Sequence, residues 1–243
     1  MKRALVTGGS GEIGAAICRQ LAQESLHVVV HAHRRRASAE NVAHQIIQAG
    51  GSAGVACFDI TDAQATQHAL AQILETGPIQ VLVNNAGVHD DAPMAGMRAD
   101  QWSKVIAVSL FGFFNVTQPL LLPMIGTRWG RIITISSISA ILGNRGQTNY
   151  AAAKAALHGA SKSLALEVAS RGVTVNVIAP GMIESPMVKQ AFTPKQIEAL
   201  VPMKRVGTPQ EVAHLVGFLA SEKAGYISGQ IIGINGGVTG GMA

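Results

Sequence analysis

Aromatic side chains, charged side chains and cysteine are all scarce in this chain of 243 residues. Aromatic residues make up 4% and form no stripe with basic residues, which argues against nucleic-acid binding despite a net charge of +5. Charged residues make up 14% and form no block that would indicate a linker or a disordered tail. The excess of positive charge therefore favours an anionic small molecule or an acidic protein as partner.

The two cysteines, Cys18 and Cys57, have the spacing of neither a metal site nor a redox motif. Met1-Lys2-Arg3 is followed directly by a strand-like segment and glycines, so the chain starts without the apolar region of a signal peptide. We therefore expect two buried free thiols, no metal site and a cytoplasmic protein.

One uncharged stretch, residues 105–127, is long enough to cross a bilayer. Polar and proline residues interrupt it, namely Ser109, Asn115, Thr117, Gln118, Pro119 and Pro123. We expect no membrane span here, but a helix buried on most sides, partly by another subunit.

Short apolar runs alternate with helix-length segments along the whole chain. The runs cover residues 4–7, 28–30, 55–58, 81–83, 132–135, 173–178 and 231–234. Strands that are apolar throughout are typical of a parallel sheet covered on both faces. The pattern predicts one α/β domain over residues 1–243, a Rossmann-type doubly wound parallel sheet of seven strands with helices on both faces. Ligands bind such a sheet at the carboxyl ends of its strands.

A glycine-rich turn, Thr7-Gly8-Gly9-Ser10-Gly11-Glu12-Ile13-Gly14, follows the first run and opens a helix predicted to end near Glu24. Glycines let the backbone approach a pyrophosphate, and the helix N-terminus supplies free N–H groups. This places a dinucleotide site in the first half, about residues 1–90, and leaves about 91–243 for catalysis and substrate.

The second run ends in a basic segment that contains His33, Arg34 and Arg35. A site for NAD usually has an acidic residue here, whereas arginines could hold the 2′-phosphate of NADP. The alternative is a solvated basic loop. After the third run, Asp59 and Ile60 could cover the adenine, although Asp59 could equally be only a helix cap.

The fifth run leads through Ser137 and a glycine-bearing loop to an alanine-rich helix with Tyr150 and Lys154. Residues four apart share a helix face, so Lys154 lies beside Tyr150 and is expected to lower its pKa. Such a phenol can exchange a proton near neutral pH, and the serine can donate to a substrate oxygen.

Together these motifs resemble the short-chain dehydrogenase/reductase family over the whole chain, and within it the bacterial 3-oxoacyl-(acyl-carrier-protein) reductases. The other matching segments are Asn84-Asn85-Ala86-Gly87, Pro180-Gly181 and Asn235-Gly236-Gly237. The resemblance implies that NADPH reduces a ketone that Tyr150 protonates, Ser137 polarises and Gln147 also contacts, while Lys154 binds the nicotinamide ribose. The remaining cofactor contacts that it implies are Gly8, Ser10, Gly11, Glu12, Ile13, Gly14, Asn85, Ala86, Gly87, Pro180, Gly181 and Ile183.

The resemblance also implies partners. The family is usually tetrameric, with helices like residues 100–125 and 150–170 packed between subunits, and a sister subunit could replace some copies. Arg128 and Arg171 match residues thought to contact the acidic carrier protein, although they could equally be ordinary surface arginines. Residues 192–201, within a segment of about 182–206, resemble a mobile substrate lid.

Two residues depart from the family pattern. Glu12 stands where the family has glycine, so it either crowds the phosphate or points outward as a first-turn acid. Ser109 stands where the family has a catalytic asparagine, which predicts a retuned proton relay with Ser109 as fourth catalytic residue.

Three functions remain open: a carrier-bound 3-oxoacyl reductase, another reductase of this fold acting on CoA thioesters, secondary alcohols or sugars, and a weakened member that serves as partner in a synthase assembly.

Overall fold

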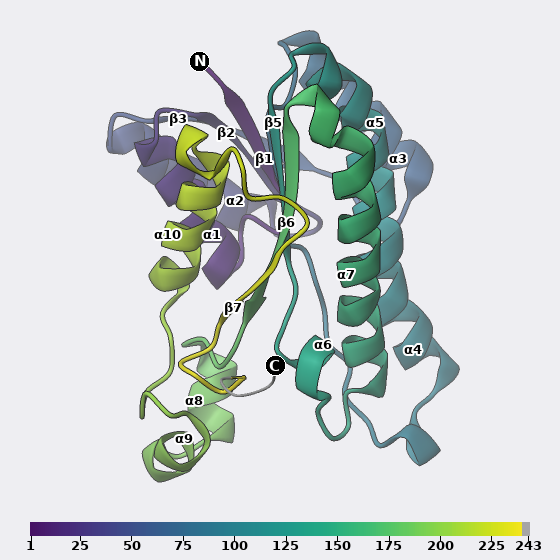
Figure 1. Cartoon of the computed structure of the whole chain (residues 1–243), viewed down its shortest axis with the longest axis vertical. Helices are drawn as coiled ribbons and strands as arrows, with labels where there is room; N and C mark the ends of the chain where they lie inside the picture. The colour runs from purple at the N-terminus through teal and green to yellow at the C-terminus, as the bar shows by residue number, and fades with distance from the viewer. Residues whose placement is uncertain (240–243) are drawn as a thin grey trace.

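The structure, a computed structural model, describes residues 1–239. Seven strands form one sheet in the order β3-β2-β1-β4-β5-β6-β7, and all neighbouring pairs are parallel (Figure 1). The strands are β1 (Arg3–Val6), β2 (His27–Ala32), β3 (Ser52–Cys57), β4 (Val81–Asn84), β5 (Gly130–Ile135), β6 (Val173–Pro180) and β7 (Ile231–Ile234). The predicted fold class is confirmed. The strand order reverses between β1 and β4, where a doubly wound sheet binds its ligand.

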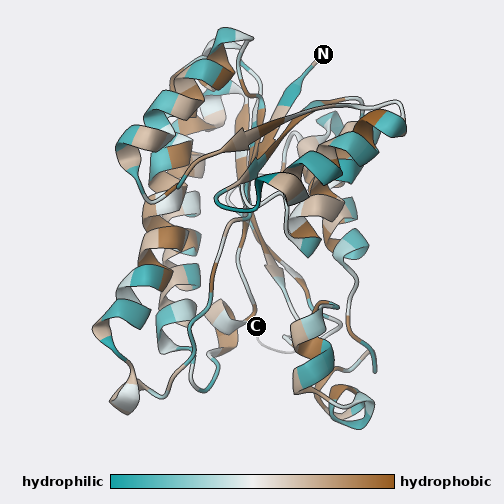
Figure 2. Ribbon diagram, turned by 180° about the vertical axis from the view of Figure 1, so that it is seen from behind, coloured by the Kyte–Doolittle hydropathy of each residue, from teal (hydrophilic) through white to brown (hydrophobic). Residues whose placement is uncertain are grey.

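Helices cover both faces of the sheet. On one face lie α1 (Glu12–Gln23), α2 (Arg36–Gln48) and α10 (Pro209–Ala220), and on the other lie α3 (Ala63–Glu75), α4 (Ala99–Ile106), α5 (Gly112–Gly126) and α7 (Thr148–Val168) (Figure 1). Each layer buries an apolar core against the sheet, and in Figure 2 the strands between the layers are mostly brown. This burial on both faces explains why most strand residues are apolar.

Shorter elements connect these layers. They are the helices α6 (Ser139–Leu142), α8 (Pro186–Ala191) and α9 (Pro194–Leu200) and the 3₁₀ turns Met94–Gly96, Ala169–Arg171 and Glu222–Ala224. In α8 and α9 a proline opens the helix, and Ser185 and Thr193 cap them. The predicted lid segment thus consists of two short helices beside the carboxyl ends of the strands (Figure 1).

The predicted start of the third strand is wrong: β3 begins at Ser52 and not at residue 55. Ser52, Ala53 and Gly54 are not strongly apolar, because β3 is an edge strand that is only half-buried along its length. The expectation of two buried thiols is also wrong in part: Cys18 is buried in α1, but Cys57 in β3 is only partly covered.

The uncharged stretch forms one helical run, Ala99–Gly126, in which α4 and α5 are joined by a π-helical segment, Ala107–Phe111. By length and composition the run could cross a membrane, and a third of its apolar window is buried within the chain. The expectation of burial on most sides is therefore not met by this chain alone, since Phe111, Phe114 and Leu122 are exposed.

Candidate active site

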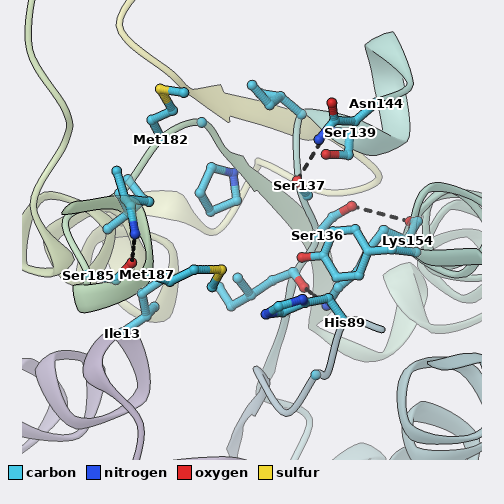
Figure 3. A pocket seen from close by; sticks show the side chains of 18 of the residues that line it. Ile13, His89, Ser136, Ser137, Ser139, Asn144, Lys154, Met182, Ser185 and Met187 are labelled. Carbon is cyan, nitrogen blue, oxygen red and sulfur yellow. Dashed lines mark hydrogen bonds between the residues drawn. The ribbon is translucent and has the colours of Figure 1, made fainter. Parts of the chain in front are cut away.

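A cavity of about 760 Å³ opens at the carboxyl ends of the strands. The glycine-rich turn, the segment after β4, the end of β5, the start of α7 and the lid segment line it. Figure 3 shows Ser136, Ser137 and Lys154 on one side and Met182, Ser185 and Met187 on another, with Ile13 nearby. The cavity thus joins the predicted nucleotide end to the predicted catalytic residues.

The glycine-rich turn is shaped to admit a close ligand. Gly8 has a φ of +63°, and a Cβ on Gly14 would lie 2.2 Å from the Gly8 carbonyl oxygen. Gly11 precedes α1 without a capping side chain, so the first N–H groups of the helix stay available. These residues fit the pyrophosphate of a dinucleotide.

Hydrogen bonds between Thr7, Gly8 and the segment after β4 hold the glycine-rich turn in place. Thr7 Oγ1 accepts hydrogen bonds from the backbone N–H groups of Asn85 and Ala86, both at 3.0 Å. The Asn85 side-chain amide donates to the carbonyls of Thr7 (2.9 Å) and Gly8 (3.1 Å). The sequence did not predict this supporting role of Thr7, because the motif alone does not show which groups its hydroxyl contacts.

His31 is a second support that the sequence did not reveal. Its Nδ1 accepts from the Gly8 N–H (3.2 Å), and its Nε2 lies 3.0 Å from the Phe58 carbonyl oxygen, to which it donates. Burial lowers the pKa of His31 to about 4, so the ring is neutral at pH 7. It therefore links the glycine-rich turn to the ends of β2 and β3.

The basic segment after β2 lies at the nucleotide end. Arg35 lines the cavity, with Nη2 4.0 Å from where a Cβ on Gly11 would be. His33 Nε2 lies 3.5 Å from Asp59 Oδ2. Burial would raise the pKa of Asp59, but hydrogen bonds from the backbone and hydroxyl of Thr61 outweigh it and lower that pKa.

Several predicted cofactor residues lie outside the cavity lining, namely Ser10, His33, Arg34, Asp59 and Ile60. The Ile60 side chain is buried in the core, so only its backbone could meet a cofactor. Asp59 is not the cap of α3, because Asp62 accepts from Ala65 N and caps that helix. Glu12 is exposed at the start of α1 and lines the cavity, which leaves both interpretations of this residue open.

Ser137, Tyr150 and Lys154 meet in the cavity as predicted. The Lys154 ammonium donates to the Ile135 carbonyl (2.8 Å) and lies 5.8 Å from the centre of the Tyr150 ring. Burial lowers the pKa of Lys154 to about 8. The lysine is thus mostly charged at pH 7, and it has no carboxylate partner among residues 1–239.

The expected lowering of the Tyr150 pKa is not found in the protein alone. Burial raises this pKa, the hydrogen bond with Ser137 opposes the rise, and the Asp91 carboxylate adds to it. Lys154 is not among these causes; its ammonium points to the Ile135 carbonyl and lies 5.8 Å from the centre of the Tyr150 ring. Tyr150 therefore stays a neutral phenol at pH 7, which is the form that can donate a proton.

Hydrogen bonds among polar residues near Tyr150 hold Gln147 in place in the part of the cavity predicted to bind the substrate. Gln147 Nε2 donates to Asp91 Oδ2 (2.8 Å), and Gln147 Oε1 accepts from Ser139 and Asn144. Apolar side chains that the sequence did not single out complete the lining, namely Leu142, Met182, Met187, Val188, Phe192 and Leu200. The proline-flanked lid segment was the only signal for these residues except Leu142, which lies in α6 and had none.

Three further predicted residues do not reach the cavity. Ser109 lies in the π-helical segment, is 3% exposed, and its hydroxyl has no hydrogen-bond partner within residues 1–239. Arg128 and Arg171 immediately precede the segments that lead into β5 and β6, so they lie at the amino ends of these strands. The cavity is at the opposite, carboxyl ends.

Comparison with known proteins agrees with this geometry. A family profile described as enoyl-(acyl carrier protein) reductase matches residues 9–239. The chain is 43% identical to the 3-oxoacyl-(acyl-carrier-protein) reductase of Escherichia coli (strain K12) over 241 residues, 98% of this chain and 97% of that protein. It is 41% identical to the same enzyme of Aggregatibacter actinomycetemcomitans over 236 residues, 96% of this chain and 98% of that protein. The chain belongs to the short-chain dehydrogenase/reductase family.

Membership in the short-chain dehydrogenase/reductase family explains why the two halves of the cavity occur together. The family uses a nicotinamide cofactor, and the turn, Asn85 and Arg35 fit its phosphate-rich end. A further relative, nodulation protein G of Azospirillum brasilense, is 43% identical over 245 residues, 98% of each chain.

Proposed function

We propose that this protein reduces a 3-oxoacyl thioester on a carrier protein to the 3-hydroxyacyl product, with NADPH as reductant. The observation that carries the proposal is the meeting of Ser137, Tyr150 and Lys154 in one cavity with the glycine-rich turn. The full-length relatives named as 3-oxoacyl-(acyl-carrier-protein) reductases support the substrate class.

The chain's own residues supply the acid for this reaction. When bound, the nicotinamide supplies a hydride to the ketone carbon. Tyr150 gives its proton to the ketone oxygen, which yields the secondary alcohol, and Ser137 donates a hydrogen bond to that oxygen. Burial raises the pKa of Tyr150, so the phenol is still protonated at pH 7 and can donate this proton. Lys154 would hold the nicotinamide ribose, and the backbone around Ile183 would meet the nicotinamide amide.

The basic segment supports NADP over NAD, since Arg35 lines the cavity and this segment holds no acidic residue. Arg34→Ala together with Arg35→Ala is expected to raise the KM for NADPH about 10- to 100-fold, because hydrogen bonds to charged groups contribute about 1.5–3 kcal/mol. The KM for NADH should change little. Steady-state kinetics with both cofactors test this, and equal losses would remove the 2′-phosphate assignment. Arg19→Ala, on the outer side of α1, is the matched control.

Carrier-protein docking at Arg128 and Arg171 would require a neighbouring subunit. The six residues of β5 alone span roughly 20 Å, so these arginines are remote from the cavity of their own chain. A homotetramer that buries Phe111, Phe114 and Leu122 would also cover the exposed apolar face of α5 and its π-helical segment. Such a protein would work in the cytoplasm as a soluble assembly.

Arg128→Ala and Arg171→Ala are expected to raise the KM for a carrier-bound substrate severalfold, because rim charges guide an acidic partner. The KM for the same acyl group on CoA should stay unchanged. Sedimentation of each variant checks that the assembly is intact. Parallel increases for both substrates would refute a specific carrier contact.

Ser109 is proposed to serve the proton path to Lys154 through its backbone. Ser109→Asn should leave turnover equal or higher, and the larger buried side chain should cost at most about 1–3 kcal/mol of unfolding free energy. Turnover and urea unfolding measure the two effects. A large loss of turnover in a folded variant would give the serine hydroxyl a role of its own.

The deciding experiment follows NADPH and NADH oxidation with an acetoacetyl thioester on carrier protein and on CoA, and with the matching crotonyl thioester. Turnover of the acetoacetyl group with a carrier preference supports the proposal. Turnover of the crotonyl group alone would favour the enoyl reduction named in the family profile's description. No turnover with any of the substrates would favour the interpretation that the protein is a non-catalytic partner in a synthase assembly.

A further inference from the structure

Ser136, the residue between the lysine-bound Ile135 and the predicted catalytic Ser137, has a buried side chain that faces α7. Its Oγ lies 3.2 Å from the Lys154 backbone carbonyl oxygen and 2.8 Å from His158 Nε2. Figure 3 draws the bond between Ser136 and Lys154. The side chain is 4% exposed, and its backbone N–H donates to Ile178 on β6 (2.7 Å). Ser136 thus joins two strands to the helix that carries Tyr150 and Lys154.

The proton count assigns the direction of these bonds. A serine hydroxyl has one hydrogen, which it donates to the Lys154 carbonyl. The bond to His158 then needs the imidazole as donor, so the Nε2–H tautomer is fixed. Half-burial and the nearby Lys162 lower the pKa of His158, and the neutral ring therefore suffices at pH 7.

Three successive residues at the end of β5 therefore contact one turn of α7. Ile135 accepts from the Lys154 ammonium and Ser136 donates to the Lys154 backbone, while Ser137 lies near enough to Tyr150 to oppose the rise of its pKa. The other residues of this turn, 151–153 and 155–156, are all alanine. Because alanines interlock little with a neighbouring surface, these hydrogen bonds set the position of the turn along β5.

We propose that His158 and Ser136 are positioning residues that hold the Tyr150 phenol against Ser137. The inference deepens the proposed function, because it names what places the acid of that reaction. Neither side chain donates a proton to the substrate, and His158 acts only through Ser136. Loss of either should slow the chemical step more than it weakens cofactor binding, since their bonds lie on the α7 side of the cavity and the glycine-rich turn is untouched.

The test compares His158→Leu, His158→Gln, Ser136→Ala and the His158→Leu/Ser136→Ala double variant. Each of the two disrupting single variants should lower kcat about 10-fold, within the 10²-fold that a 1 Å misplacement can cost. The Kd for NADPH should change much less than kcat, and His158→Gln, which keeps a donor, should recover most of kcat. The double variant should be no slower than Ser136→Ala, because that change already removes the bond that His158→Leu breaks.

A second readout does not depend on turnover. The chain has two tyrosines, so Tyr226→Phe leaves Tyr150 as the one tyrosine signal when Cζ is labelled for NMR. His158→Leu in this background should shift that signal as the Ser137 hydrogen bond weakens. His214→Leu, at an exposed histidine of α10, should leave it in place.

An unmoved Tyr150 signal in His158→Leu, or additive losses in the double variant, would overturn the inference. If the wild-type protein turns over none of the thioesters, the proposed function is refuted instead. The NMR readout would still decide whether His158 positions the phenol.

Discussion

Tyr150→Phe is expected to lower turnover by about 10²- to 10⁴-fold, the range that a positioned general acid contributes. The change removes one oxygen and leaves the ring in its half-buried place beside the lid. Cofactor affinity should stay the same, because the turn, Asn85 and Arg35 are untouched. Turnover measured with saturating acetoacetyl thioester, together with the Kd for NADPH, separates these two effects.

Tyr226→Phe is the matched control, since this second tyrosine is fully exposed and lies outside the cavity. It should keep wild-type turnover. A Tyr150→Phe variant with near-normal turnover would show that another group protonates the ketone oxygen. Because burial raises the Tyr150 pKa, no loss of the phenol's proton should limit reduction below about pH 10, where an ordinary tyrosine titrates.

The fold could be predicted because its strands are buried on both faces. An apolar run such as residues 81–83 suits a strand buried between two helical layers, and it lies within β4. Edge strand β3 has no such constraint, so its polar start at Ser52 went unrecognised. The π-helical segment around Ser109 also left no signal, because its residues would suit an ordinary helix equally well.

Within the site, spacing predicted which side chains meet but not what state they are in. Tyr150 and Lys154 lie on one face of α7, as four residues of separation require. Yet the Lys154 ammonium is bonded to the Ile135 carbonyl, a partner from another element that no local pattern specifies. His31 and His158 escaped notice for the same reason, since their partners lie 27 and 22 residues away. Arg128 and Arg171 precede β5 and β6, so the parallel sheet places them at its amino ends, away from the cavity of their own chain.

Lys154→Met is expected to abolish most turnover and, at pH 7, to stabilise the folded protein. Burial lowers the pKa of Lys154 from 10.5 to about 8, so holding the charged form costs roughly 3 kcal/mol relative to the unfolded chain. Methionine fills the space without a charge. A gain of even 1–2 kcal/mol would raise Tm by roughly 2–8 °C for a chain of this size. Differential scanning calorimetry with turnover on the same sample measures both effects.

The pH dependence distinguishes the burial cost from a packing effect. Between pH 8 and 10.5 the unfolded lysine binds a proton that the folded one has lost, so this residue makes the wild type more stable as pH rises. The Lys154→Met variant lacks that rise, and its advantage should shrink across this window. Lys162→Met, at an exposed lysine two turns along α7, should show no such convergence. If Lys154→Met is instead less stable at pH 7, the bond to Ile135 outweighs the cost of the buried charge. In that case the ammonium would be a structural tie between β5 and α7 as well as a group for the cofactor.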